Sequence, residues 1–529
     1  MIETPKISLH SAPSADDYVE AQRQRMRRFA MGGALLALVA AGAFAGVSLG
    51  NPILPLVVLI VVMLPVLMWR YPSFPMYMLL AAICLFETGP SKYTDEITGH
   101  VPFFWNFNTI VQVYTHSNFK AIPLNLLEVF ILLAVAIALI RAVYSQTVEF
   151  RTGTLFWPIA IYMLFVAFGW LHGMTSGGDF KISLQEVRSQ FYFLLAYLFA
   201  VNTIRDVRQI KTIQWIMVLS IALKGVLYTF RRYVTIAGQP LPDQGVGSHE
   251  EAFFFDCFAV FLVILIVCKI DKRMRTFMWI LLPLVVTGNL ACNRRAATAA
   301  MVVVIPMLLA AAYAAFPARR KWIAIFSVVG GILGLGYYQA FKNSDSLYAQ
   351  PARAIKSQFA PDERDMLSNA YRDAENADLI GTVKVSPVIG YGYGKRMLHL
   401  VPIADISKEY DWWDIMTHNQ ILWVWMRVGT IGFVAFWCMV CAILFAGCRI
   451  VRSAASTPHA KAFAMFSLTA TGMLMIFGLL DLQLSNFRDM MFVGSWAGVL
   501  AAIPGLKQMQ EGDAGETVPA SGDLQRIGQ

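Results

Sequence analysis

A histidine stands where a polar segment of the chain gives way to an apolar run. The stretch DWWDIMTHNQILWVWMRVGTIG occupies residues 411–432, and His418-Asn419 immediately precedes its apolar part. An imidazole can accept or release a proton near neutral pH. If this run enters a bilayer, the ring lies beside water and against a low-dielectric wall. Whether this proton exchange matters depends on the side of the membrane that His418 faces and on the groups that face it.

Arginines offer a complementary chemistry, because a planar guanidinium can hold two oxygens of a phosphate at once. Arg294 and Arg295 stand together in the turn 293–296 between two apolar runs, where an unneeded positive pair would oppose membrane insertion. Arg188 and Arg372 lie in other polar segments on the same predicted side. These four arginines are candidate ligands of a phosphate or diphosphate. The alternative is contact with lipid phosphates at helix ends.

The segment PVIGYGYGK, residues 387–395, is rich in glycine. A dinucleotide-binding loop needs a strand before it and a helix after it, and this sequence offers no such context. Gly390 and Gly392 instead indicate a tight chain reversal, close to a ligand or to another helix, or else a plain turn.

Acidic residues occur in two settings. Asp362, Glu363 and Asp365 could bind a divalent cation, but the sequence DERD is more typical of a solvated helix start. Ionisable groups also fall within the apolar runs, where each is either functional or part of an internal ion pair. They are Glu128, Lys224, Asp256 and Arg427.

The composition indicates what kind of structure positions these groups. Of 529 residues, 57% are hydrophobic, whereas soluble proteins average roughly 45–50% apolar residues, and the mean hydropathy is +0.56. The net charge of +9 does not indicate nucleic-acid binding, because the basic residues sit in short loops on alternate sides of apolar runs. The seven cysteines form neither a disulfide framework nor a metal-ligand spacing.

Apolar runs near the length needed to cross a bilayer predict an all-α fold, a polytopic transmembrane helix bundle of about 12–14 spans. The predicted helices are 29–49, 52–69, 72–87, 122–142, 154–173, 190–204, 212–230, 252–269, 277–292, 297–316, 322–341, 419–447, 461–480 and 490–506.

Lysines and arginines gather in alternate connections, which predicts that this side and both termini are cytoplasmic. The loop 342–418, far longer than the usual connection, predicts a small helical external subdomain of two or three helices ending at His418. The predicted division of the chain is a cytoplasmic segment (1–28), N-terminal helices (29–150), a transmembrane core with external arginines (151–341), the external subdomain (342–418), C-terminal helices (419–506) and a disordered cytoplasmic tail (507–529).

Over roughly residues 150–505 the chain resembles the O-antigen ligase and polysaccharide polymerase family. Three motifs carry the resemblance: HNQILWVWMRVGTIG with His418 and Asn419; YRDAENADLIGTVKVSPVIGYGYG with Arg372, Gly390 and Gly392; and NRRAATAA with Arg295. Arg294 departs from the residue usual at its place. The segment DFKISLQEVRSQFYF, with Glu186 and Arg188, resembles the family's amphipathic stretch before a span.

The resemblance implies a glycosyltransferase of the bacterial inner membrane, acting on the periplasmic side. Its donor would be an undecaprenyl-diphosphate-linked oligosaccharide, its acceptor a glycan or lipid A-core, and other polysaccharide-assembly proteins its potential partners. Arg295 and Arg372 would hold the diphosphate, and His418 would take the acceptor's hydroxyl proton in an inverting displacement. No cofactor or metal is implied.

The form YRDAEN and the additional N-terminal helices favour an exopolysaccharide or O-antigen polymerase over an O-antigen ligase that transfers glycan to lipid A-core or protein. A polysaccharide or glycolipid transporter is the alternative of another class. It predicts repeated halves and helices broken at mid-membrane.

Overall fold

The computed structural model describes residues 42, 63–88, 97–115, 124–145, 150–239, 245–248, 250–408, 412–454 and 456–514. These residues form helices and no strands, and ten of the helices are long and apolar enough to cross a membrane. The all-α polytopic fold predicted from the sequence is thus confirmed. The predicted helix 29–49, apart from one residue, and most of the predicted helix 52–69 lie outside the described residues.

The chain forms two compact units, one made of residues 1–74 and 130–148 and the other of 75–129 and 149–529. Every candidate site residue belongs to the second unit. Its first helices are α3 (Phe74–Leu85), α4 (Phe107–Thr115), α6 (Phe156–Thr175), α7 (Phe180–Thr203) and α8 (Val207–Phe230), while α5 (Leu126–Ser145) begins in it and continues in the other. At 12 residues, α3 is shorter than the span predicted at 72–87 and too short to count among the ten.

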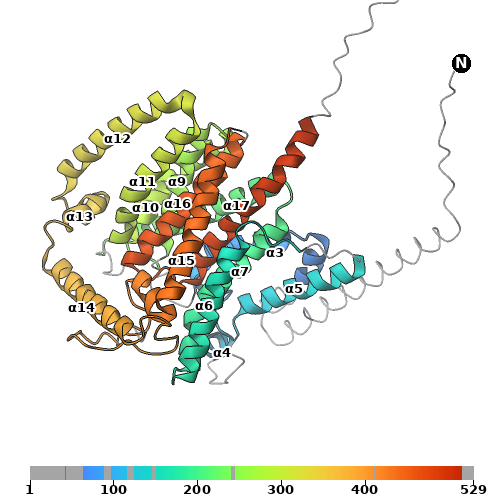
Figure 1. Cartoon of the computed structure of the whole chain (residues 1–529). Coiled ribbons are helices and arrows are strands. Elements are labelled where there is room, and N and C mark those ends of the chain that lie inside the picture. Colours follow the sequence, from blue (N-terminus) through green and yellow to red (C-terminus); the bar gives the residue numbers. More distant parts are fainter. Residues whose placement is uncertain are drawn as a thin grey trace, which may run out of the picture. The chain divides into compact units, whose positions relative to one another are not determined.

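The second half of the chain continues as a series of long helices. They are α9 (Glu251–Cys268), α10 (Lys272–Ala291), α11 (Arg295–Ala315), α12 (Arg320–Phe341), α15 (Gln420–Arg452), α16 (Pro458–Leu480) and α17 (Phe487–Ala514). Figure 1 shows α9, α10, α11, α15 and α16 side by side. Helix α17 runs past the expected end of the last span into the predicted tail, of which residues 515–529 lie outside the described residues.

Helix α7 differs from its prediction as an external stretch followed by a span at 190–204. It is one continuous helix, and its first half buries polar side chains that include Glu186, Arg188 and Gln190. This polarity explains why α7 is not among the ten apolar helices.

Helices α7 and α17 pack closely because two glycines lie between their backbones. A Cβ at Gly494 would lie 2.4 Å from the carbonyl oxygen of Phe193, and one at Gly498 would lie 2.6 Å from that of Tyr197. Small residues four apart are a common means of close approach between membrane helices. The polar half of α7 is therefore held inside the protein rather than against lipid.

The long segment between α12 and α15 contains a 3-10 turn (Leu347–Ala349), the short helix α13 (Gln350–Lys356) and the helix α14 (Glu363–Val385). Asp362 caps α14 by accepting a hydrogen bond from the Asp365 backbone N–H at 2.8 Å. The prediction of two or three helices in this segment agrees with these elements.

Candidate functional site

One face of α14 carries the polar residues that connect it with two other helices. Asp365, Ser368, Arg372 and Glu375 follow each other at intervals of three, four and three residues, so they form one stripe along the helix. The stripe spans about 15 Å at a rise of about 1.5 Å per residue. Its members contact the first residues of α11 and the residues just before α15.

Arg295, the first residue of α11, contacts the beginning of this stripe. Its Nη1 lies 2.8 Å from Asp365 Oδ1, and its Nη2 donates to Ser368 Oγ at 3.3 Å. The Arg295 side chain keeps 26% of its surface exposed. Arg294 precedes it as the half-buried N-cap residue of α11. The sequence indicated Asp365 as part of a helix start or, alternatively, as a cation ligand, and its pairing with Arg295 was missed.

Arg372 lies in the middle of the stripe. Burial lowers the pKa of its guanidinium, the carboxylates of Asp481 and Glu375 raise it, and the positive charges of Arg295 and Arg294 lower it. The structure therefore brings the two arginines of the 293–296 turn and Arg372 within electrostatic range of one another. Two further carboxylates, at Glu375 and Asp481, share this neighbourhood.

His418 contacts the far end of the stripe through Glu375. The His418 backbone N–H donates to Glu375 Oε2 at 3.0 Å, and Nδ1 of the ring lies 3.2 and 3.3 Å from the two carboxylate oxygens. The Glu375 side chain is 1% exposed and that of His418 is 26% exposed. The Tyr371 ring meets the imidazole edge to face at 5.9 Å between centroids. The sequence offered no signal for Glu375, because its partner is 43 residues away.

Asn419, predicted to contact substrate, caps α15 instead. Its Oδ1 accepts a hydrogen bond from the Leu422 backbone N–H at 3.1 Å. The His-Asn dipeptide thus combines an imidazole with the residue that starts the helix behind it, since asparagine is among the best N-caps. Substrate contact by Asn419 stays a prediction.

The glycine-rich segment packs against two helices, which agrees with the alternative of a reversal close to another helix. Gly390 and Gly392 have φ of +86° and +85°, a conformation that favours glycine. A Cβ at Gly392 would lie 2.6 Å from Cα of Gly173 in α6, and one at Gly390 would lie 2.4 Å from the backbone N of Gly429 in α15. Both glycines therefore serve chain packing, and their contact with substrate stays a prediction.

Helix α15 is interrupted where this segment meets it. Gly429 has non-helical φ and ψ of 68° and 179°. The Thr430 N–H donates to the Pro387 carbonyl at 2.8 Å, and the Tyr391 N–H donates to the Met426 carbonyl at 2.7 Å. Because protein backbone occupies the break, this interruption offers no support for the ion-binding broken helix of a transporter.

Two other predicted residues of interest form internal ion pairs. Arg188 is buried, with Nε 3.0 Å from Glu128 Oε1 and Nη1 3.2 Å from Asn106 Oδ1. The partners of Arg188 are not those of the α14 stripe. Its role as a diphosphate ligand stays a prediction, and these contacts do not support it. Arg427 lies 2.5 Å from Glu186, and both side chains are fully buried.

Glu186 also holds the glycine-rich segment in place. Its Oε2 accepts the Gly394 N–H at 2.6 Å, and its Oε1 accepts from the Trp423 indole at 3.2 Å. Burial raises the pKa of Glu186 to about 7 against the lowering influence of Arg427. This ion pair joins α7, α15 and the glycine-rich segment.

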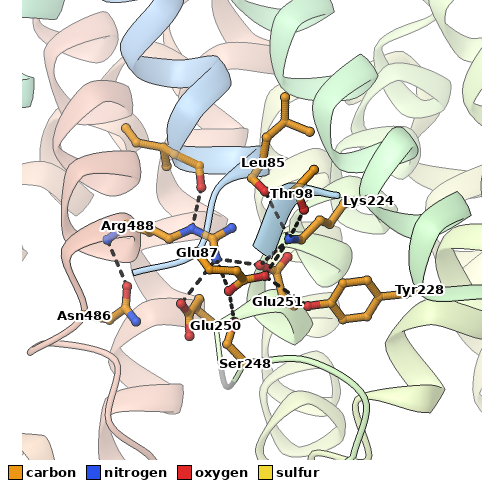
Figure 2. A network of polar contacts seen from close by, with 11 residues as sticks. Leu85, Glu87, Thr98, Lys224, Tyr228, Ser248, Glu250, Glu251, Asn486 and Arg488 are labelled. Carbon is orange, nitrogen blue, oxygen red and sulfur yellow. Dashed lines mark hydrogen bonds and ion pairs between the residues drawn. The ribbon is translucent and has the colours of Figure 1, made fainter. Parts of the chain in front are cut away.

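A second set of charges, which we call the buried carboxylate network, connects residues from segments far apart in the sequence (Figure 2). Its charged members are Glu87, Lys224, Glu250, Glu251 and Arg488. Lys224 Nζ lies 2.5 Å from Glu87 and 3.7 Å from Glu251, while Arg488 Nη1 lies 3.2, 3.2 and 2.5 Å from Glu87, Glu250 and Glu251. No charged side chain in it is more than 4% exposed.

Neutral groups complete this network. Ser248 Oγ donates to Glu87 at 2.6 Å, and Lys224 also donates to Thr98 and to the Leu85 carbonyl. Burial raises the pKa of Glu87, but the charges of Lys224 and Arg488 outweigh it and bring the value to about 2. Lys224, ambiguous from the sequence, is thus one partner of an internal ion-pair network.

The fold and the site together define a class: a multi-pass helical membrane protein in which partly exposed arginines and an imidazole from three segments gather along one helix, α14. This set is suited to hold an anionic group and to take a proton beside it. Residues 280–437 match the family described as O-antigen ligase. The protein therefore contains an O-antigen ligase family domain and is a glycosyltransferase of the O-antigen ligase and polymerase type. The matched residues include Arg295, Arg372 and His418. The curated proteins give no match to the chain.

Proposed function

We propose that this protein polymerises lipid-diphosphate-linked glycan units on the periplasmic face of a bacterial inner membrane. The observation that carries the proposal is the order of groups along α14. Arg295 contacts Asp365 and Ser368 at one end of the stripe, Arg372 lies in its middle, and His418 contacts Glu375 at the other end. A diphosphate held by the arginines would direct its attached sugar toward the imidazole.

In the proposed reaction, an acceptor hydroxyl attacks the anomeric carbon of the donor sugar. The new glycosidic bond forms as the bond from that carbon to the phosphate oxygen breaks, and the electron pair leaves with the lipid diphosphate. His418 takes the hydroxyl proton, and the arginines stabilise the charge that develops on the leaving phosphate. The helix N-termini of α11 and α15 both lie at this site and add partial positive charge. A single displacement inverts the anomeric configuration.

Transfer to lipid A-core is the second candidate, supported by the O-antigen ligase family match. The test is incubation of the purified protein with undecaprenyl-diphosphate-linked oligosaccharide, with and without lipid A-core. A ladder of longer lipid-linked glycans supports the polymerase. Glycan on lipid A-core alone replaces it with the ligase, and the absence of both products overturns the proposal. A protein with His418→Ala serves as the inactive control.

A further inference from the structure

The contacts of Glu375 define a role for this residue beyond the stabilisation of α14. It is the one residue of the α14 stripe whose carboxylate meets both the backbone and the ring of His418. At 1% exposure it is withdrawn from solvent, whereas the imidazole it meets is partly open. The carboxylate thus contacts only one nitrogen of the ring, Nδ1.

We infer that Glu375 is a positioning residue that fixes the tautomer of His418 and so makes Nε2 the base of the transfer reaction. An ionised carboxylate only accepts hydrogen bonds, so its contact with a neutral imidazole requires the proton on Nδ1. Nε2 then carries the lone pair. Among the described residues, no hydrogen bond of the protein occupies Nε2. This inference rests on the proposed function, because it supplies the reason why His418 can act as its base.

The same carboxylate has a second effect once the proton moves. When Nε2 takes the proton of the acceptor hydroxyl, the ring becomes an imidazolium, and Glu375 lies 3.2 Å from its Nδ1–H. The positive charge forms beside a buried negative charge, which stabilises it without movement of either side chain. Glu375 takes up no proton in this step. The backbone contact from the His418 N–H keeps the carboxylate aligned throughout.

Two substitutions separate this role from a merely structural one. Glu375→Gln keeps the shape of the side chain, but its amide N–H₂ can donate to Nδ1 and so favours the tautomer with its proton on Nε2. Glu375→Asp keeps the charge on a shorter side chain. Asp373→Asn provides the control, because Asp373 is an exposed carboxylate on the same helix.

The expected result for Glu375→Gln is a fall in kcat of about 10³–10⁴-fold, by analogy with the carboxylate-to-amide change in a serine protease triad. The donor KM should stay within about threefold, because the arginines that hold the diphosphate are unchanged. Glu375→Asp should recover at least about tenfold of the lost kcat, since it restores the acceptor of the Nδ1 proton. Asp373→Asn should match the wild type. A kcat for Glu375→Gln within threefold of the wild type would overturn the inference, as would equal losses in the Gln and Asp variants.

A spectroscopic measurement tests the inference without turnover. In protein with ¹⁵N-labelled histidine, the resonances missing from a His418→Gln variant identify His418. Nδ1 should be protonated in the neutral ring of the wild type, and Nε2 in that of Glu375→Gln. The same tautomer in both proteins would refute the assignment. If the wild type transfers no glycan, the proposed function fails, and this spectrum still decides whether Glu375 sets the tautomer.

Discussion

The buried carboxylate network and the α14 stripe are both sets of acidic and basic side chains, yet they differ in exposure. In the network, the charged side chains are at most 4% exposed, and two cations meet three carboxylates. Along the stripe, Arg295 and His418 each keep 26% of their surface exposed. Charged side chains that are withdrawn from water must form ion pairs and hydrogen bonds with one another. A partly exposed charged side chain can instead replace a protein partner with a bound ligand.

This difference separates residues that hold the fold from residues that we propose act on a substrate. The network joins the segment after α3, helix α8, the beginning of α9 and the beginning of α17 (Figure 2). Its removal should therefore unfold the protein. Loss of Arg295, Arg372 or His418 should instead reduce binding or turnover and leave stability nearly unchanged.

The largest effect is expected at His418. His418→Ala should lower kcat by about 10⁴-fold, the upper end of the usual contribution of a positioned general base, because it removes the group that Glu375 only positions. The melting temperature should change little, because the ring is partly exposed and packs mainly on Tyr371 and Glu375. Glycan transfer in detergent and thermal unfolding of the same preparation measure both quantities. Near-normal transfer by this variant would remove the assigned role.

Arg488→Met should have the largest effect on stability. It leaves three buried carboxylates with Lys224 as their remaining cation, and breaking a buried charge group in this way costs about 3–5 kcal/mol. Arg372→Met, on the stripe, should cost less than about 1 kcal/mol. Denaturant titration of the two variants in mixed micelles makes the comparison. Similar losses of stability in both would show that the network and the stripe do not differ as described.

Substitution of Arg372 in the stripe, or of Arg295 that contacts it, should have a smaller effect, on affinity alone. Lysine keeps the charge of Arg295 or Arg372 but loses the two-pronged guanidinium. Each substitution should raise the Kd for the lipid-linked donor about tenfold, or about 1.4 kcal/mol. Scintillation proximity binding of radiolabelled donor provides the measurement. Full donor affinity in both lysine variants would exclude bidentate binding.

The smallest effect is a pH dependence of the network. The pKa of Glu87 falls from 4.5 to about 2 on folding, so its ionised form stabilises the protein above pH 4.5. That stability is lost progressively as the pH falls from 4.5 toward 2, with a loss on the order of 1 kcal/mol by pH 4. The free energy of unfolding should therefore decrease between pH 6 and pH 4 by more in the wild type than in Glu87→Gln. Equal slopes would contradict the lowered pKa.

The sequence was sufficient for what depends on local pattern. Apolar runs predicted the long helices, because a span must be continuous along the chain. Arg295, Arg372 and His418 were identified from short motifs, and the structure places all three along α14. What the sequence could not supply were the partners. Glu375 pairs with His418 across 43 residues, and Arg488 reaches Glu87 across 401. Such pairings depend on the packing of distant helices, for which a single sequence carries no periodic signal.

The sequence also did not show which motif residues shape the backbone. Gly390, Gly392 and Asn419 were assigned to substrate because they belong to motifs, and that assignment stays a prediction. The structure adds that they contact Gly429, Gly173 and the first turn of α15. A motif records which residue types occur together. It does not distinguish a residue that contacts a ligand from one that fixes the backbone conformation of the neighbouring loop.

The α14 stripe also constrains how this enzyme could change. Arg372 and Glu375 are less than one helical turn apart on the same helix, so any tilt or axial shift of α14 displaces both the proposed anion ligand and the carboxylate that contacts His418. Movement of this helix therefore cannot change the affinity for the donor without also changing the support of His418. Adaptation to a new sugar would have to come from the surrounding loops, while α14 keeps its alignment.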